Sequence, residues 1–243
     1  MSEQEENADR KARMIKAKRN LTFLMLFSIV MFFAGLTSAY MVSKGSSDYW
    51  LNFHLPNAFW WSTGFILLSS VTLQIALIQA RKDHKRSVAP WVMLTLALGL
   101  CFSASQFKGW KMLFEDGYAL VSRLKNVDAH AVYGTDYTIE RRGLTLVKNG
   151  DQFYLPDDTE FTHPMNAEMN ESMNSASSYF YVLTYSHFAH IIGGLIALLV
   201  MSIKALLGRY GQEDHQGLWA GTIFWHFLAG LWVYLLLFLA YVH

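Results

Sequence analysis

Charged residues are scarce in this sequence. Asp, Glu, Lys and Arg make up 16% of its 243 residues, whereas soluble globular proteins contain about 25%. The scarcity is local, because five stretches contain none of these four residues: Leu21–Val42, Phe59–Ala80, Ala89–Phe107, Tyr179–Ile203 and Leu218–Val242. Each stretch has 19 to 25 residues, enough for a helix to cross a hydrocarbon core about 30 Å thick. This pattern excludes a soluble domain and a nucleic-acid-binding protein, and it predicts an all-α membrane protein with five transmembrane helices.

Cysteine, membrane-embedded carboxylates and proline are also nearly absent. Cys101 is the one cysteine, so no internal disulfide can form and a disulfide scaffold is excluded. None of the five stretches contains a carboxylate, which disfavours a proton or cation pump because pumps place ionisable groups at membrane depth. Only Pro90 touches a stretch, so the broken helices of secondary transporters are not indicated.

Basic residues are divided unevenly among the connecting segments. Residues 1–20 and the segments after the second and fourth stretches hold twelve Lys and Arg, whereas the segment after the first stretch holds only Lys44. Short cytoplasmic segments carry the excess of basic residues. We therefore expect an inner-membrane protein with a cytoplasmic basic tail at residues 1–20 and a periplasmic C-terminus. The first stretch is longer than a signal-peptide core, so we expect an uncleaved span.

Aromatic residues and turn signals indicate the structure of the segments that we expect on the periplasmic side of the membrane. Four aromatic residues at the first external segment are typical of the interface: Tyr49, Trp50, Trp60 and Trp61. The polar segment 108–178 contains Asn149-Gly150 between two strand-like runs, which predicts a two-residue β-hairpin turn, and Tyr137–Glu140 is a candidate third strand. The expected organisation is the tail 1–20, helices one to three in 21–107, a periplasmic insertion at 108–178, and helices four and five in 179–243.

Met165, Met169 and Met173 recur every four residues near the end of this insertion, as on one face of a helix. Thioethers bind Cu(I), so a copper-loading site is one interpretation. We favour the other, a helical turn that packs against a neighbour, because no cysteine lies nearby and His163 is the only imidazole in the vicinity.

Three histidines lie inside the apolar stretches: His187, His190 and His226. The first two are three residues apart and share a helix face. One interpretation is a b-type haem or a metal held by one of them together with His226. We favour the alternative, neutral imidazoles that hydrogen-bond between helices. The expected partners are a backbone carbonyl or the side chains of Thr184, Tyr185 and Ser186.

Each of the five stretches contains a distinctive motif. The fifth has Phe224-Trp225-His226-Phe227 and then Trp232, and the fourth has Thr184, His187, His190 and Gly194. The first three have their motifs at Ser28–Gly35, Thr63–Ser70 and Leu98–Trp110. This ordered set resembles subunit III of the heme-copper oxidases, the cytochrome c oxidase family. The fifth stretch is similar to that family's aromatic-W-H-F segment and its following tryptophan, and the fourth to its T-G-x-H-G-x-H and its following glycine.

The chain also departs from that family. It resembles the five-span bacterial form, which lacks the first two helices of the seven-span form. Other residues replace the family's membrane carboxylates, so roles in proton transfer are not carried over. The segment 108–178 has no counterpart in the family's short loop. The four replacing residues are Ile29, Gly109, Trp219 and Ala229.

The resemblance implies an accessory subunit of a terminal oxidase in a bacterial inner membrane, with no catalytic, cofactor-binding or metal-binding residues of its own. Heme and copper would lie in partner subunits, and oxidase subunits I and II would be its partners. Lys204 occupies the place of a family residue that touches lipid phosphate, so we expect phospholipid there. We further expect residues 108–178 to dock an external partner, such as subunit II, a cytochrome donor or another respiratory complex. The implied packing residues are Thr184, His187, His190, Gly194, Trp225, His226, Phe227 and Trp232.

Two alternatives remain open from the sequence. The same role in a quinol oxidase or a nitric oxide reductase would leave the same motifs, because the electron-donor site lies on other subunits. A b-type cytochrome that uses His187 or His190 with His226 belongs to a different class, and a haem spectrum of the isolated chain would distinguish it.

Overall fold

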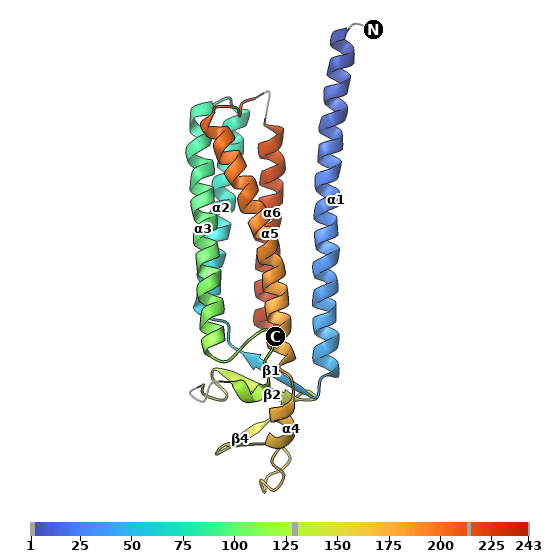
Figure 1. Cartoon of the computed structure of the whole chain (residues 1–243), viewed down its shortest axis with the longest axis vertical. Coiled ribbons are helices and arrows are strands. Elements are labelled where there is room, and N and C mark those ends of the chain that lie inside the picture. The colour runs from blue at the N-terminus through green and yellow to red at the C-terminus, as the bar shows by residue number, and fades with distance from the viewer. Residues whose placement is uncertain (1–2, 128–130, 213–214, 243) are drawn as a thin grey trace. The chain divides into compact units, whose positions relative to one another are not determined.

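The computed structural model describes residues 3–127, 131–212 and 215–242. Five of the described helices are long and apolar enough to cross a membrane, which confirms the predicted fold class and identifies the chain as a membrane protein (Figure 1). These helices are α1 (Glu3–Ser46), α2 (Asn57–Arg81), α3 (Lys85–Glu115), α5 (Ser175–Leu206) and α6 (Gln216–Tyr241).

All five long helices extend beyond the apolar stretches that predict them, and α1, α3 and α5 do so by four residues or more. α1 includes nearly all of the polar tail, because residues 3–20 are rich in strong helix formers and contain neither glycine nor proline. Its 44 residues correspond to a length of about 66 Å, roughly twice the thickness of the hydrocarbon core. α3 continues to Glu115 and α5 begins at Ser175. The insertion is therefore helical at both of its ends.

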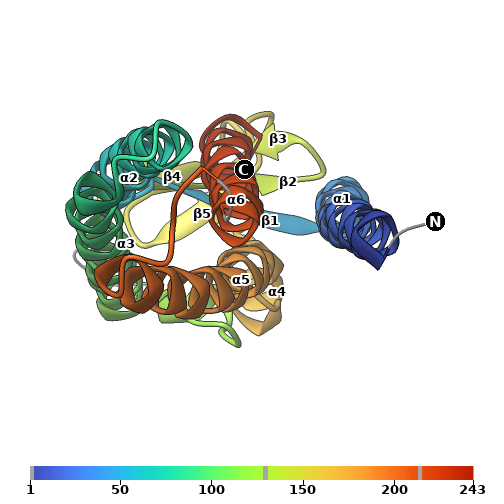
Figure 2. The ribbon, with the colours of Figure 1, turned by 90° about the horizontal axis from the view of Figure 1, so that it is seen from above.

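The chain divides into two units, and the five long helices pass through both. Unit 1 comprises Met1–Ala34, Thr63–Phe102 and Ala189–Trp232, and unit 2 comprises Gly35–Ser62, Ser103–Phe188 and Val233–His243. In unit 1, α1 lies beside α5 and α6, with α2 and α3 on their other side (Figure 2). Only a narrow stripe of α1 is buried there, at Leu26, Ile29 and Phe33. Most of the other side chains between Phe23 and Phe32 are apolar and exposed, as expected for a helix that faces lipid.

Unit 2 carries the extramembrane strands. β1 (Tyr49–Phe53), β2 (Tyr137–Arg141) and β3 (Leu144–Thr145) form an antiparallel sheet in that order, with Leu51 opposite Ile139. A separate hairpin consists of β4 (Val147–Asn149) and β5 (Gln152–Tyr154). A short 3-10 helix at Leu124–Asn126 and α4 (Asn166–Glu171) complete the insertion.

The predicted hairpin is present, but its turn is shifted by one residue. Asn149 pairs with Gln152, so the two loop residues are Gly150 and Asp151, not Asn149 and Gly150. Gly150 has φ +62°, which suits a turn that takes glycine at its first loop position.

The candidate third strand exists, but it does not join the hairpin. β2 pairs with β1, which lies between α1 and α2, on one edge and with β3 on the other. Leu51 and Ile139 are both about fully buried, with 0% and 1% exposure. The insertion therefore gains its order from another part of the same chain.

The methionine stripe is only partly helical. α4 ends at Glu171, so Met173 lies beyond it and is 51% exposed, whereas Met169 is 3% exposed. The Met165 thioether lies 2.7 Å from Arg141 Nη1. Met165 precedes α4 and Met173 follows it, so the expectation of one continuous helical face is wrong at both ends. Met169 lies within α4 and packs inward, as the favoured interpretation expects.

Candidate functional site in the motif core and its neighbouring pocket

The indole of Trp225 lies at the centre of the motif residues in unit 1. Its side chain is 1% exposed, and its Nε1 donates a hydrogen bond to Ser69 Oγ at 2.9 Å. Two glycines allow the ring this position. A Cβ atom at Gly99 would lie 3.1 Å from the ring, and one at Gly194 would lie 2.9 Å from it. Gly194 of the family motif is therefore half of a slot for Trp225.

α2 and α6 are joined by a series of polar contacts within unit 1. Trp232 Nε1 donates to Thr63 Oγ1 at 2.9 Å, as Trp225 does to Ser69. Hydrogen bonds between side chains can stabilise helix pairs in an apolar medium. We call this set the α2–α6 seam, and it consists of Thr63, Ser69, Ser70, Gln74, Trp225, His226 and Trp232.

His226 uses both of its ring nitrogens in this seam. Nε2 lies 3.1 Å from Gln74 Oε1 and therefore donates, while Nδ1 accepts from the Ser70 hydroxyl. The sequence indicates interhelical hydrogen bonding for this histidine but places its partners on α5 or the backbone. The partners in the structure are polar residues of α2, and each ring nitrogen has one.

The motif residues of α5 lie in different surroundings. Thr184 is buried in unit 2, where its hydroxyl accepts from Trp110 Nε1 at 3.3 Å and donates to the Phe180 carbonyl at 2.9 Å. His187, also in unit 2, is 1% exposed. His190 belongs to unit 1, and its ring centroid lies 5.7 Å from that of Phe33.

Phe227, the remaining motif residue, is half-buried on α6. Sequence reasoning placed Ser70 and Gly99 in the family-like motifs without assigning them to this core, and it missed Gln74. The available signal was the presence of polar or small residues inside apolar stretches, which are typical of helix contacts in membranes.

A cationic pocket lies near the N-terminal end of α6 in unit 1. It has a volume of about 470 Å³ and is formed by α1, the end of α5, the start of α6 and the segment between them. Lys204 lines it, and Trp219, Ile15 and Leu21 supply apolar walls. None of the described residues that line this pocket is acidic. The four cationic lining residues are Lys18, Arg19, Lys204 and Arg209.

An ionic cluster ties the insertion together in unit 2. Glu168 of α4 accepts from Arg141 Nη2 at 2.9 Å and from the Tyr49 hydroxyl at 3.1 Å. The Arg141 guanidinium also lies 5.3 Å from the centroid of the Tyr49 ring. Burial is the main cause that raises the pKa of Tyr49, so its hydroxyl keeps the proton that it donates. The cluster links β1, β2 and α4.

A protein-family match covers the part of the chain that holds the motif residues of α5 and α6. Residues 153–243 match the family model described as cytochrome c oxidase subunit III. A probable cytochrome c oxidase subunit 3 of Nocardia farcinica is 23% identical over 87% of this chain and 81% of its own length. A cytochrome c oxidase subunit 3 of Synechocystis is 36% identical over 28% of this chain and 30% of its own length.

A probable quinol oxidase subunit 3 of Staphylococcus saprophyticus is 20% identical over 70% of this chain and 59% of its own length. Both electron-donor classes thus occur among the relatives. Residues 153–243, which hold the motif residues of α5 and α6, are thus similar to subunit III of the heme-copper oxidases, and the relatives that cover most of the chain bear the names of such subunits.

Proposed function

We propose that this chain is the accessory, cofactor-free subunit III of a terminal cytochrome c oxidase, where it stabilises the catalytic subunit during O2 reduction. Its partners are the oxidase subunits I and II, which carry the heme and copper. The main support is the family match over residues 153–243. The match includes Gly194, Trp225 and His226, which pack and hydrogen-bond within the bundle.

The equivalent subunit of a quinol oxidase is the second candidate, and the relative from Staphylococcus saprophyticus favours it. The b-type cytochrome is less well supported, because Ser70 and Gln74 engage both ring nitrogens of His226. A haem ligand needs one of those nitrogens free.

Purification of the chain in mild detergent tests the proposed role. We expect it to co-purify with subunits that carry heme and copper, and we expect the isolated chain to show no reducible haem absorption. To distinguish the two donor classes, the rates at which the complex oxidises cytochrome c and a quinol are measured and compared. A haem spectrum of the isolated chain that disappears in His226→Asn would establish the cytochrome alternative instead.

We propose that the cationic pocket binds the phosphate of an anionic phospholipid. Lys204 and Arg209 supply positive charge from one side of the pocket, and Lys18 and Arg19 of α1 supply it from another. Basic residues just outside a span attract anionic headgroups, each with about 1 kcal/mol. The continuity of α1 supports this role, because it fixes both of its cations close to the start of the apolar stretch.

We propose that the insertion, residues 108–178, docks a further protein outside the membrane. Replacing residues 119–173 with a short Gly/Ser linker should leave the helices inserted and O2 reduction with an artificial donor largely intact. Retention of an external partner on native gels should weaken. A matched variant, Arg141→Gln, keeps the whole segment and disrupts only the ionic cluster. It shows whether loss of that cluster alone weakens the retention of the partner. Loss of O2 reduction with every partner retained would refute docking.

A further inference from the structure

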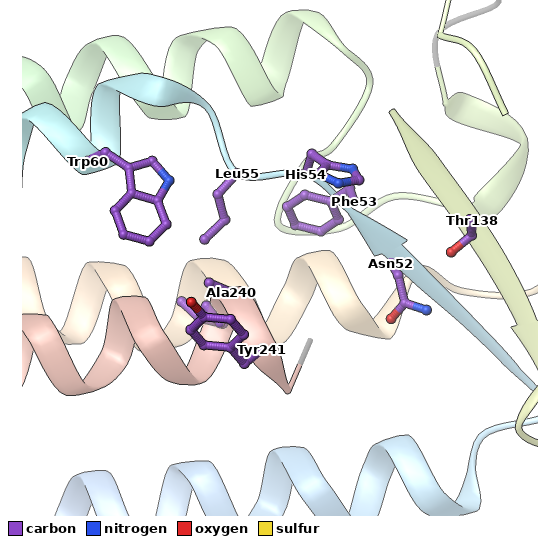
Figure 3. A pocket seen from close by; sticks show the side chains of 9 residues that line it. Asn52, Phe53, His54, Leu55, Trp60, Thr138, Ala240 and Tyr241 are labelled. Carbon is purple, nitrogen blue, oxygen red and sulfur yellow. The ribbon is translucent and has the colours of Figure 1, made fainter. Parts of the chain in front are cut away.

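A second cavity, of about 320 Å³, opens in unit 2 where the sheet adjoins the ends of two helices. β1 and the residues after it form one wall, and Thr138 of β2 contributes from the insertion. The first turn of α2 and the last turn of α6 form the remainder, with Trp60 and Tyr241 (Figure 3). All of these segments belong to the same unit.

The lining of this cavity is mainly apolar at the helices and includes polar side chains at the strands. In Figure 3, Trp60, Leu55 and Tyr241 lie alongside the helices, whereas Asn52 and Thr138 lie at the strands. Trp60 is 46% exposed and Tyr241 is 80% exposed. Exposed tryptophan and tyrosine at the ends of spans are typical of the headgroup level of a membrane. The cavity therefore suits one end of an amphipathic molecule at that level.

Two side chains of opposite charge, neither of which lines the cavity, hydrogen-bond to Asn52 at its polar end. Asn52 Oδ1 accepts from Lys44 Nζ at 3.5 Å, and Asn52 Nδ2 donates to Glu140 Oε1 at 2.8 Å. An ammonium and a carboxylate therefore lie on the two sides of Asn52. A zwitterionic phospholipid headgroup carries a phosphate and an ammonium, the complementary pair.

The size of the cavity indicates how much of a lipid it can hold. A volume of about 320 Å³ is near the lower limit for small-molecule sites, so it accommodates a headgroup and glycerol but not the acyl chains. These chains have an apolar surface to follow outside the cavity, because Trp61 of α2 and Leu237 of α6 are 71% and 43% exposed.

We propose that this cavity binds the headgroup and glycerol of one zwitterionic phospholipid from the leaflet on the side of the sheet. This inference requires only that the chain spans a membrane, and it does not depend on the oxidase role. Because β2 supplies Thr138, the insertion completes a lipid site that the helices alone would not form.

Photo-crosslinking in vesicles tests the site. The full chain is reconstituted in phosphatidylethanolamine and phosphatidylglycerol, with a trace of phosphatidylethanolamine that carries a diazirine in its headgroup. We expect crosslinks at residues 52–60 and 239–241. Ala240→Phe should abolish them by filling the cavity. Thr138→Val should reduce them by about two- to tenfold, the value of one neutral hydrogen bond, and valine suits the strand.

Ala39→Phe is the matched control, because Ala39 is an exposed alanine in a span that does not line the cavity. It should leave the crosslinks unchanged. Circular dichroism checks the fold of each variant, and Thr138→Val carries the test should Ala240→Phe misfold. Equal crosslinking in wild type and Thr138→Val would overturn the proposal. Equal labelling of the cavity by a diazirine-bearing phosphatidylglycerol would also overturn it. The same holds if a quinone, but not excess phosphatidylethanolamine, displaces the probe from the cavity.

Discussion

Gly193 and Gly194 are adjacent residues on α5 with different surroundings. A Cβ at Gly194 would lie 2.9 Å from the Trp225 ring, whereas a Cβ at Gly193 would meet nothing within 4 Å. Gly194→Ala should therefore destabilise the protein by about 1–3 kcal/mol, as overpacking does. Gly193→Ala should be neutral or slightly stabilising. Thermal unfolding of both variants in one detergent measures the difference, and equal melting temperatures would show that the slot does not constrain Trp225.

Lys204 and Arg209 provide a second comparison of single residues. Lys204→Gln and Arg209→Gln should each lower the retention of anionic phospholipid about fivefold, which corresponds to about 1 kcal/mol per charge. Lys82→Gln, on the segment between α2 and α3 and outside the pocket, is the control. Native mass spectrometry of the purified chain counts the bound lipids. A loss of the same size in all three variants would indicate general surface attraction rather than a pocket.

His226 illustrates how much of the candidate site could be predicted from the sequence. A polar ring inside an apolar stretch must find a hydrogen-bond partner, so the type of interaction follows from composition alone. The helix that supplies the partner does not, because periodicity identifies faces within one helix and not the neighbour opposite each face. Ser70 and Gln74 of α2 could be identified only once the helices were placed.

The elements of the insertion were only partly predictable for a related reason. Glycine, polar turns and strand-forming residues are local signals, so β2 and the hairpin could be predicted. β1, the partner strand of β2 that lies outside the insertion, could not be predicted, because the same aromatic residues are typical of a membrane interface and of a strand. Its pairing with β2 joins residues far apart in the chain, and no local pattern encodes such a contact.

A cross-strand disulfide tests the β1–β2 register. Asn52 lies opposite Thr138, and Cα atoms of opposed antiparallel residues are about 4.5–5.5 Å apart, within the range of a disulfide. In a Cys101→Ser background, Asn52→Cys with Thr138→Cys should oxidise readily, as detected by mass spectrometry. Asn52→Cys with Ile139→Cys should not, because adjacent strand residues face opposite sides. The reverse result would mean a register shifted by one residue.

For the whole molecule, the number of spans was predictable because the length of an apolar run directly reflects the thickness of a membrane. The orientation is a prediction from the basic residues. With Cys101 replaced by serine, a cysteine at Asn149 should react with an impermeant thiol reagent added outside cells. A cysteine at Lys85 should react only after the membrane is opened. Labelling in the opposite pattern would place the insertion in the cytoplasm and invert every assignment of sides.

The β1–β2 pair also sets an order of events during biosynthesis. Asn52 and Glu140, which hydrogen-bond across the two strands, are 88 residues apart. At a synthesis rate of about 5–20 residues per second, the partner residue of β2 is translated roughly 4 to 18 s after that of β1. During that interval α2 and α3 must both enter the bilayer and return the chain to the side of β1. A newly made chain that inserted only one of these helices would leave Leu51 without its strand partner. Quality-control chaperones and proteases can recognise such an unpaired strand. The β1–β2 pair therefore forms only in chains whose third span has been inserted.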